Sequence, residues 1–204
     1  MNAEMQASPK SADLELWLIR HGETEWSASG KHTSRTDVPL TARGRESAKA
    51  IGQYLGKREF SLILTSPRQR AQETCRIAGY SSRAIMDDNL AEWDYGDYEG
   101  RTTAEIRSQD AGWSIWSAAV PSGESIEQVA ERAESIILRT EGVGGRVALF
   151  SHAHFLRILA ATWIGLSARS GSLFALGTGS VSILGFERET RVLQMWNRSF
   201  EIES

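Results

Sequence analysis

Short apolar runs alternate with segments of helical periodicity along most of this 204-residue chain. The runs LELWLI, FSLILT and RVALF have the length and the apolar content of buried strands. A segment between two of them places Ala48, Ile51 and Leu55 at helical spacing after Thr41, a residue type that caps helices. Strands that alternate with helices predict an α/β layered fold with a mainly parallel sheet.

The same patterns set approximate bounds for the elements. A capping box formed by Thr102 and Glu105 predicts a further short helix. The irregular stretch 88–123 is long for a connection, so we expect it to cover the sheet and serve function. We expect strands at 14–19, 60–65, 84–86 and 146–150, a closing strand pair at 180–186 and 192–196, and helices at 41–56, 67–78, 124–140 and 154–164.

Composition argues for one soluble domain. The formal net charge is −3, so no global basic field attracts nucleic acid or anionic lipid. The single cysteine, Cys75, excludes an internal disulfide and fits a reducing compartment. No apolar run is long enough for a membrane helix, and the polar start resembles no signal peptide. We therefore expect a tail at 1–12, one domain at 13–204, a cytoplasmic location, and an oligomeric state left open, with a homodimer as one alternative.

Three expected strands deliver arginine or histidine where they end. Arg20 and His21 follow the first strand, the segment 66–70 follows the second, and His152 follows the strand RVALF. Because ligands bind at the carboxyl ends of parallel strands, these side chains should line one crevice. Helices that start after Pro67 and after His152 would add backbone N–H groups. The combination suits a phosphoryl group.

These residue types predict a specific chemistry. A neutral imidazole is a competent nucleophile, and a covalent phosphoenzyme divides hydrolysis into two easier transfers. Arginine forks stabilise the charge of the transferring group, since each fork can hold two oxygens. A carboxylic acid beside the crevice would protonate the leaving alkoxide, and Glu92 is the best candidate. The scheme needs no metal and no cofactor, and its partner is a small phosphorylated molecule.

Six sequence blocks resemble the histidine phosphatase superfamily, which includes phosphoglycerate mutases and many phosphatases. They are LIRHGETEW, GKHTSRTDVPLTARG, TSPRQRAQET, LAEWDYGDYEG, PSGES and FSHAHFLRIL, in the order of that family. The resemblance covers roughly residues 14–165. Two of the blocks, GKHTSRTD and EWDYGDYEG, are most similar to a branch of sugar-bisphosphatase-like and acid-phosphatase-like members. The family implies a three-layer sandwich: a mixed, mostly parallel sheet, helices on both faces, and a cap at about 92–140.

The resemblance also implies roles for particular positions. His21 matches the nucleophile, Glu92 the acid and His152 the second histidine of the site. The phosphate-binding arginines match Arg20 and Arg70. The candidate substrate-binding residues are Ser27, Thr33, Ser34, Tyr95 and Ala153. Two of these depart from the pattern, since Ser34 and Ala153 stand where glycine is usual. We expect either a narrower pocket or a shifted backbone donor there, and the effect on activity stays open.

Several alternatives stay open at this point. A phosphoglycerate mutase would carry lysine where this chain has Thr103, so we favour hydrolysis of a sugar phosphate or bisphosphate. A phosphatase acting on phosphorylated proteins, and a binding protein without catalysis, are further alternatives. His152 and His154 form an H-x-H pair that is an alternative metal site. We expect His32 to be a loop residue and Cys75 an inert core residue.

Overall fold

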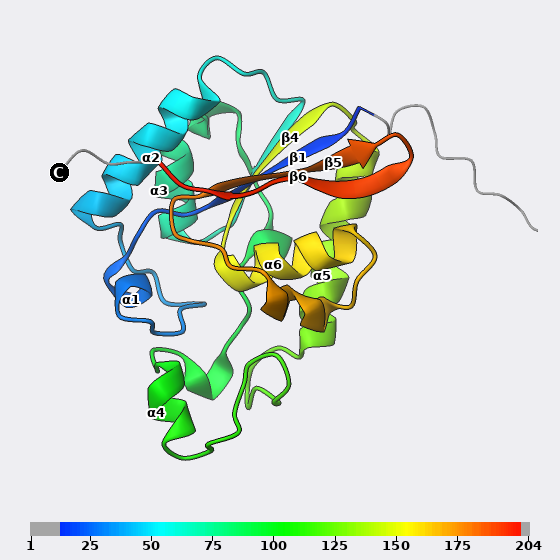
Figure 1. Ribbon diagram of the computed structural model, residues 1–204. Helices are drawn as coiled ribbons and strands as arrows, with labels where there is room; N and C mark the ends of the chain where they lie inside the picture. Colours follow the sequence, from blue (N-terminus) through cyan, green and yellow to red (C-terminus); the bar gives the residue numbers. More distant parts are fainter. Residues whose placement is uncertain (1–12, 201–204) are drawn as a thin grey trace, which may run out of the picture.

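The computed structural model describes residues 13–200, so the expected tail at 1–12 lies outside the described residues. Six strands form one sheet in the order β3-β2-β4-β1-β5-β6 (Figure 1). The first four strands run parallel, whereas β5 pairs antiparallel with β1 and β6 antiparallel with β5. This confirms the predicted mixed, mostly parallel sheet. The strands are β1 (Glu15–Arg20), β2 (Leu62–Thr65), β3 (Ile85–Met86), β4 (Arg146–Ser151), β5 (Val181–Glu187) and β6 (Thr190–Arg198).

Helices cover both faces of the sheet, which confirms the three-layer arrangement. Two separate apolar clusters result: α2 and α3 pack on one face, and α5 and α6 pack on the other (Figure 1). The helices are α1 (Glu25–Ala28), α2 (Ala42–Leu55), α3 (Gln69–Ile77), α4 (Thr103–Arg107), α5 (Ile126–Glu141) and α6 (Ala153–Trp163), with short 3-10 turns η1 (Ser81–Arg83), η2 (Asp88–Leu90), η3 (Gly96–Tyr98) and η4 (Ala168–Leu173).

Helix starts follow the capping residues seen in the sequence, with one difference. The hydroxyl of Thr41 accepts a hydrogen bond from the N–H of Gly44 and begins α2. Thr102 and Glu105 form the expected capping box of α4. Helix α3 begins at Gln69, two residues later than Pro67. The reason is local: the N–H of Arg68 donates to Ser66 Oγ at 3.2 Å, which holds a turn before the helix.

The segment between β3 and β4 divides into two parts. Residues 92–125 contain η3 and α4 and lie beyond the carboxyl edge of the sheet, where α4 is the outermost helix in Figure 1. Helix α5, which also belongs to the expected cap region, packs instead against α6 in the apolar core. No helix within residues 13–200 is long and apolar enough to cross a membrane.

The loop after β1 approaches the start of α2 very closely. Thr41 donates its backbone N–H to the carbonyl oxygen of Glu23 at 2.9 Å, and its hydroxyl donates to the Glu23 carboxylate. Gly22 and Gly44 face each other across this contact, and a Cβ on either would overlap backbone atoms of the other segment. Because the overlap involves backbone, it cannot be relieved by a rotamer change.

We therefore expect Gly44→Ala to destabilise the protein by about 1–3 kcal/mol, the usual cost of overpacking a tight contact. The measurement is the free energy of unfolding from chemical denaturation. Gly112→Ala is the matched control, because an added Cβ there meets one side-chain atom at an ordinary 3.8 Å. Equal stability of the two variants would contradict the close packing of this loop against α2.

Candidate active site

The ends of β1, β4 and β2 meet at one edge of the sheet. The register pairs Arg20 with Ser151 and Thr65 with Phe150, so the three strand exits are neighbours. As a result, the rings of His21 and His152 lie with their centroids 5.1 Å apart. The sequence-predicted histidines thus come together from positions that are distant in the chain.

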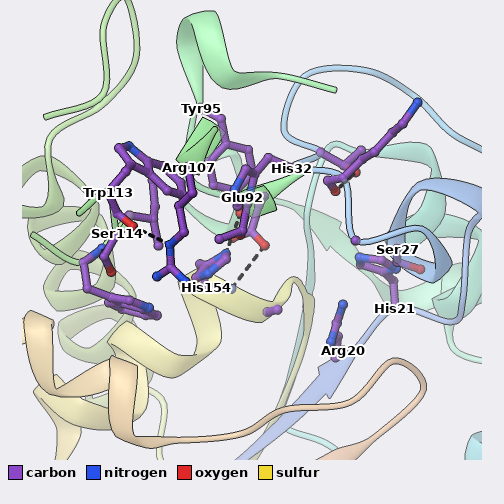
Figure 2. A pocket seen from close by; sticks show the side chains of 17 residues that line it. Arg20, His21, Ser27, His32, Glu92, Tyr95, Arg107, Trp113, Ser114 and His154 are labelled. Atoms are coloured by element: carbon purple, nitrogen blue, oxygen red, sulfur yellow. Dashed lines mark hydrogen bonds between the residues drawn. The ribbon is translucent and has the colours of Figure 1, made fainter. Parts of the chain in front are cut away.

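His21 is 5% exposed and lines a cavity of about 340 Å³ at this edge (Figure 2). Its Nδ1 lies 2.7 Å from the carbonyl oxygen of Gly22. A carbonyl oxygen only accepts hydrogen bonds, so Nδ1 carries the ring proton and Nε2 keeps its lone pair. Burial, with the charges of Arg70 and Arg20, lowers the pKa of His21 well below its ordinary value. The ring is therefore neutral, and Nε2 is its unprotonated nitrogen.

His152 is fully buried and hydrogen-bonded through Nε2 to Ser66 Oγ at 2.7 Å. Ser66 Oγ also accepts the N–H of Arg68 at 3.2 Å. His152 Nδ1 is buried without a protein partner among residues 13–200. In the sequence, Ser66 was only the first residue of the segment 66–70 that follows the second expected strand. In the structure, its hydroxyl orients the ring of His152.

Of the two predicted arginines, Arg20 lines the cavity and Arg70 does not. One of the terminal nitrogens of Arg20 donates to the carbonyl oxygen of Leu176. Burial lowers the pKa of Arg20 to about 10, so it remains a cation near neutral pH. Arg70 is fully buried below the cavity wall. Its terminal nitrogens donate to the carbonyl oxygens of Thr33, Thr36 and Ser34 at 3.0, 3.1 and 3.2 Å, and its Nε has no protein partner within the described chain.

Glu92 lies at the N-terminus of α6 and is 7% exposed. Its carboxylate accepts backbone N–H groups from Trp93, His154 and Phe155 at 3.0, 3.1 and 2.9 Å. These bonds fix the group at the wall of the cavity, on the side away from β1 (Figure 2). The structure therefore brings Glu92 into the same cavity as His21, across a separation of 71 positions in the sequence.

Four of the five predicted substrate-binding residues line this cavity: Ser27, Thr33, Tyr95 and Ala153. Ser34 lies outside it. The backbone N–H and the hydroxyl of Ser34 both donate to the carboxylate of Glu99, at 2.9 and 2.6 Å, which ties the loop to η3. The hydroxyl bond to Glu99 is one that glycine at this position could not form.

An aromatic cluster forms the wall behind Glu92, and sequence reasoning did not identify it as a unit. Tyr95 Oη and His154 Nδ1 are hydrogen-bonded at 2.6 Å, and burial raises the pKa of Tyr95 and lowers that of His154, so both are neutral. The ring of His32 is tilted against Tyr95 and packs edge-on against Trp113, and it lies in the cavity wall. The remaining lining residues are Gly30, Lys31, Thr103, Arg107, Ser114, Ile115 and Trp116.

The rings of His152 and His154 face different partners, Ser66 and Tyr95. Across the described part of the chain, no three His, Cys, Asp or Glu side chains are grouped so as to hold a metal ion. Cys75 is buried in α3, where burial raises the pKa of its thiol to about 12.

The lowered pKa of His21 predicts a specific pH dependence. A histidine whose pKa is depressed in the folded protein stays neutral as the pH falls below about 6.5, so His21 keeps its unprotonated Nε2 in this range. We expect kcat/KM for an aryl phosphate, corrected for ionisation of the substrate, to show no acid limb near 6.5. In Arg20→Gln, one of the two depressing charges is absent, so the acid limb should move to higher pH. A wild-type acid limb at the ordinary histidine pKa would contradict this electrostatic environment.

Comparison with known proteins identifies the family. The model of the histidine phosphatase superfamily (branch 1) matches residues 16–199. An acid phosphatase of Mycobacterium tuberculosis is 44% identical over 182 residues, covering 87% of this chain and 89% of that protein. A sedoheptulose 1,7-bisphosphatase of Saccharomyces cerevisiae is 35% identical, covering 74% and 68%. The solved structure of the product of a Mycobacterium tuberculosis open reading frame superposes with a TM-score of 0.86 at 40% identity, covering 92% of this chain and 98% of that one. The chain belongs to the histidine phosphatase superfamily.

Proposed function

We propose that this protein is a phosphomonoesterase that hydrolyses a small phosphorylated metabolite, a sugar phosphate or bisphosphate, through a phosphohistidine on His21. One observation carries the proposal: His21 Nε2 is an unprotonated nitrogen in a cavity lined by Arg20, because Nδ1 is bound to the carbonyl oxygen of Gly22. A neutral imidazole held beside a guanidinium suits attack on an anionic phosphoryl group.

In the first step, His21 Nε2 forms a bond to phosphorus and the bond from phosphorus to the ester oxygen breaks. We assign the ring proton of His152 to Nδ1, with Ser66 Oγ donating to Nε2. This N–H, the positive charge of Arg20 and the nearby charge of Arg70 then stabilise the phosphoryl oxygens. The start of α6, which follows His152 directly, adds the positive end of a helix dipole.

Glu92 gives its proton to the departing ester oxygen. The three backbone N–H groups that hold its side chain then stabilise the resulting carboxylate. In the second step, the same carboxylate takes a proton from water as the water oxygen attacks phosphorus. The bond between phosphorus and Nε2 breaks, inorganic phosphate leaves, and His21 returns to its neutral form.

The cavity supports a compact substrate. Its volume of about 340 Å³ and its wall of aromatic and hydroxyl side chains suit a sugar phosphate better than a phosphorylated protein. The mutase alternative is disfavoured because the cavity presents Thr103 where a mutase would have lysine. The binding-protein alternative is disfavoured because the nucleophile, its arginines and the acid are all present. A cytoplasmic location, supported by the single buried cysteine, is part of the same proposal.

The test of the function is a panel of phosphorylated metabolites assayed for phosphate release in the presence of EDTA. We expect the wild type to release phosphate without added metal and His21→Ala to lose turnover, because the covalent route is absent. A folded His21→Ala variant with near-normal turnover, or wild-type activity that appears only with a divalent ion, would refute the proposed mechanism. Circular dichroism supplies the check on folding.

Glu92→Gln separates the role of the acid from general damage to the site. A sugar alkoxide needs a proton in order to leave, whereas p-nitrophenolate leaves without one. The variant should therefore lose much more activity on a sugar phosphate than on p-nitrophenyl phosphate, and the aryl substrate should show a burst of p-nitrophenolate. Equal losses on both substrates without a burst would show that Glu92 is not the leaving-group acid.

A further inference from the structure

Arg107, the last residue of α4, lines the end of the cavity that is remote from the nucleophile. Figure 2 shows its side chain beside Trp113 and above His154, on the far side of Glu92 from His21. Its Nε donates to the carbonyl oxygen of Trp113 at 2.9 Å, and this bond orients the guanidinium. No acidic side chain within residues 13–200 forms an ion pair with it, so its two terminal nitrogens remain available as donors.

The cavity as a whole has an excess of positive charge. Its basic lining residues are Arg20, Lys31 and Arg107, and its acidic lining residue is Glu92. Both oxygens of Glu92 already accept backbone N–H groups at the start of α6. Arg20 lies next to the nucleophile in sequence and serves the phosphoryl group that is transferred. The positive charge of Arg107, at the end of the cavity remote from His21, is therefore more than the transfer of one phosphoryl group requires.

Another arginine of the same segment provides a contrast. Arg101 precedes α4 and donates to Gln109 Oε1 at 2.9 Å and to the carbonyl oxygen of Glu105, and its guanidinium lies over the ring of Tyr98. These contacts belong to the cap itself, and Arg101 does not line the cavity. Arg107 instead has one backbone contact and faces the substrate space.

The surroundings of Arg107 fit an anionic group. Ser114 lines the cavity beside it, and its Oγ accepts the N–H of Trp116 at 3.3 Å, so its hydroxyl proton can donate elsewhere. A guanidinium fork together with a hydroxyl donor is suited to carboxylate or phosphate oxygens, because the fork can hold two of them at once.

We propose that Arg107 binds a second oxyanion of the substrate, a phosphate or a carboxylate, while the scissile phosphate lies at His21. The inference rests on the proposed function and narrows its substrate class to doubly anionic metabolites. In this arrangement, hydrolysis occurs at the end near His21, and the second group remains intact on the product. Arg107 thereby selects both the substrate and the end that is cleaved.

The experiment compares kcat/KM for substrates that differ in the remote group. Fructose 1,6-bisphosphate is compared with fructose 1-phosphate and fructose 6-phosphate for a remote phosphate, and 3-phosphoglycerate with glycerol 3-phosphate for a remote carboxylate. We expect the wild type to prefer the doubly anionic member of at least one pair by about tenfold or more, as a charge-assisted fork is worth about 1.4 kcal/mol or more. The pair that shows the preference identifies the remote group.

Arg107→Gln should reduce that preference to near unity, mainly through KM, and Arg107→Lys should restore part of it because the charge is retained. Arg101→Gln is the matched control and should keep the wild-type preference. A wild type without preference, or an Arg107→Gln variant that keeps it, would overturn the inference while leaving the phosphatase proposal intact. A wild type that releases no phosphate from any substrate, p-nitrophenyl phosphate included, would refute the proposed function itself.

Discussion

The hydrogen bond between His21 Nδ1 and the carbonyl oxygen of Gly22, 2.7 Å long, connects the fold to the chemistry. It exists because the chain turns sharply after β1, and that turn requires glycine where the loop meets the start of α2. The bond fixes the tautomer, which leaves Nε2 with its lone pair. Local backbone geometry thus leaves Nε2 free for the nucleophilic role that we propose for it.

Burial and positive charge then act in the same direction on this ring. Both disfavour imidazolium, so the ring that we propose as the nucleophile stays neutral, and the same arginines place positive charge beside it. Arg70 also donates from its terminal nitrogens to carbonyl oxygens of the loop at 33–36. Because Thr33 of this loop lines the cavity, the guanidinium of Arg70 helps to position the cavity wall. The site is therefore a small region of positive charge in a protein whose formal net charge is −3.

The sequence predicted those features that depend on neighbours in the chain. Apolar runs and capping residues located the main strands and helices to within a few residues, and the strand exits pointed to His21 and His152. The contacts of Arg70 with a loop more than thirty positions away could not be predicted, because nothing local specifies them. The same holds for Ser34, which departs from the family pattern and bonds to Glu99. Arg107 belongs to none of the sequence blocks that resemble the family, so only the folded structure reveals that it lines the cavity.

We propose that His21 Nε2 carries the phosphoryl group during turnover. The most direct measurement is to quench the reaction under basic conditions, locate the phosphate by mass spectrometry and determine the bonded nitrogen by phosphorus and nitrogen NMR. We expect one acid-labile phosphate per chain, on His21 and bonded to Nε2. Phosphate on Nδ1 of that ring, on His152 or on no residue at all would contradict it.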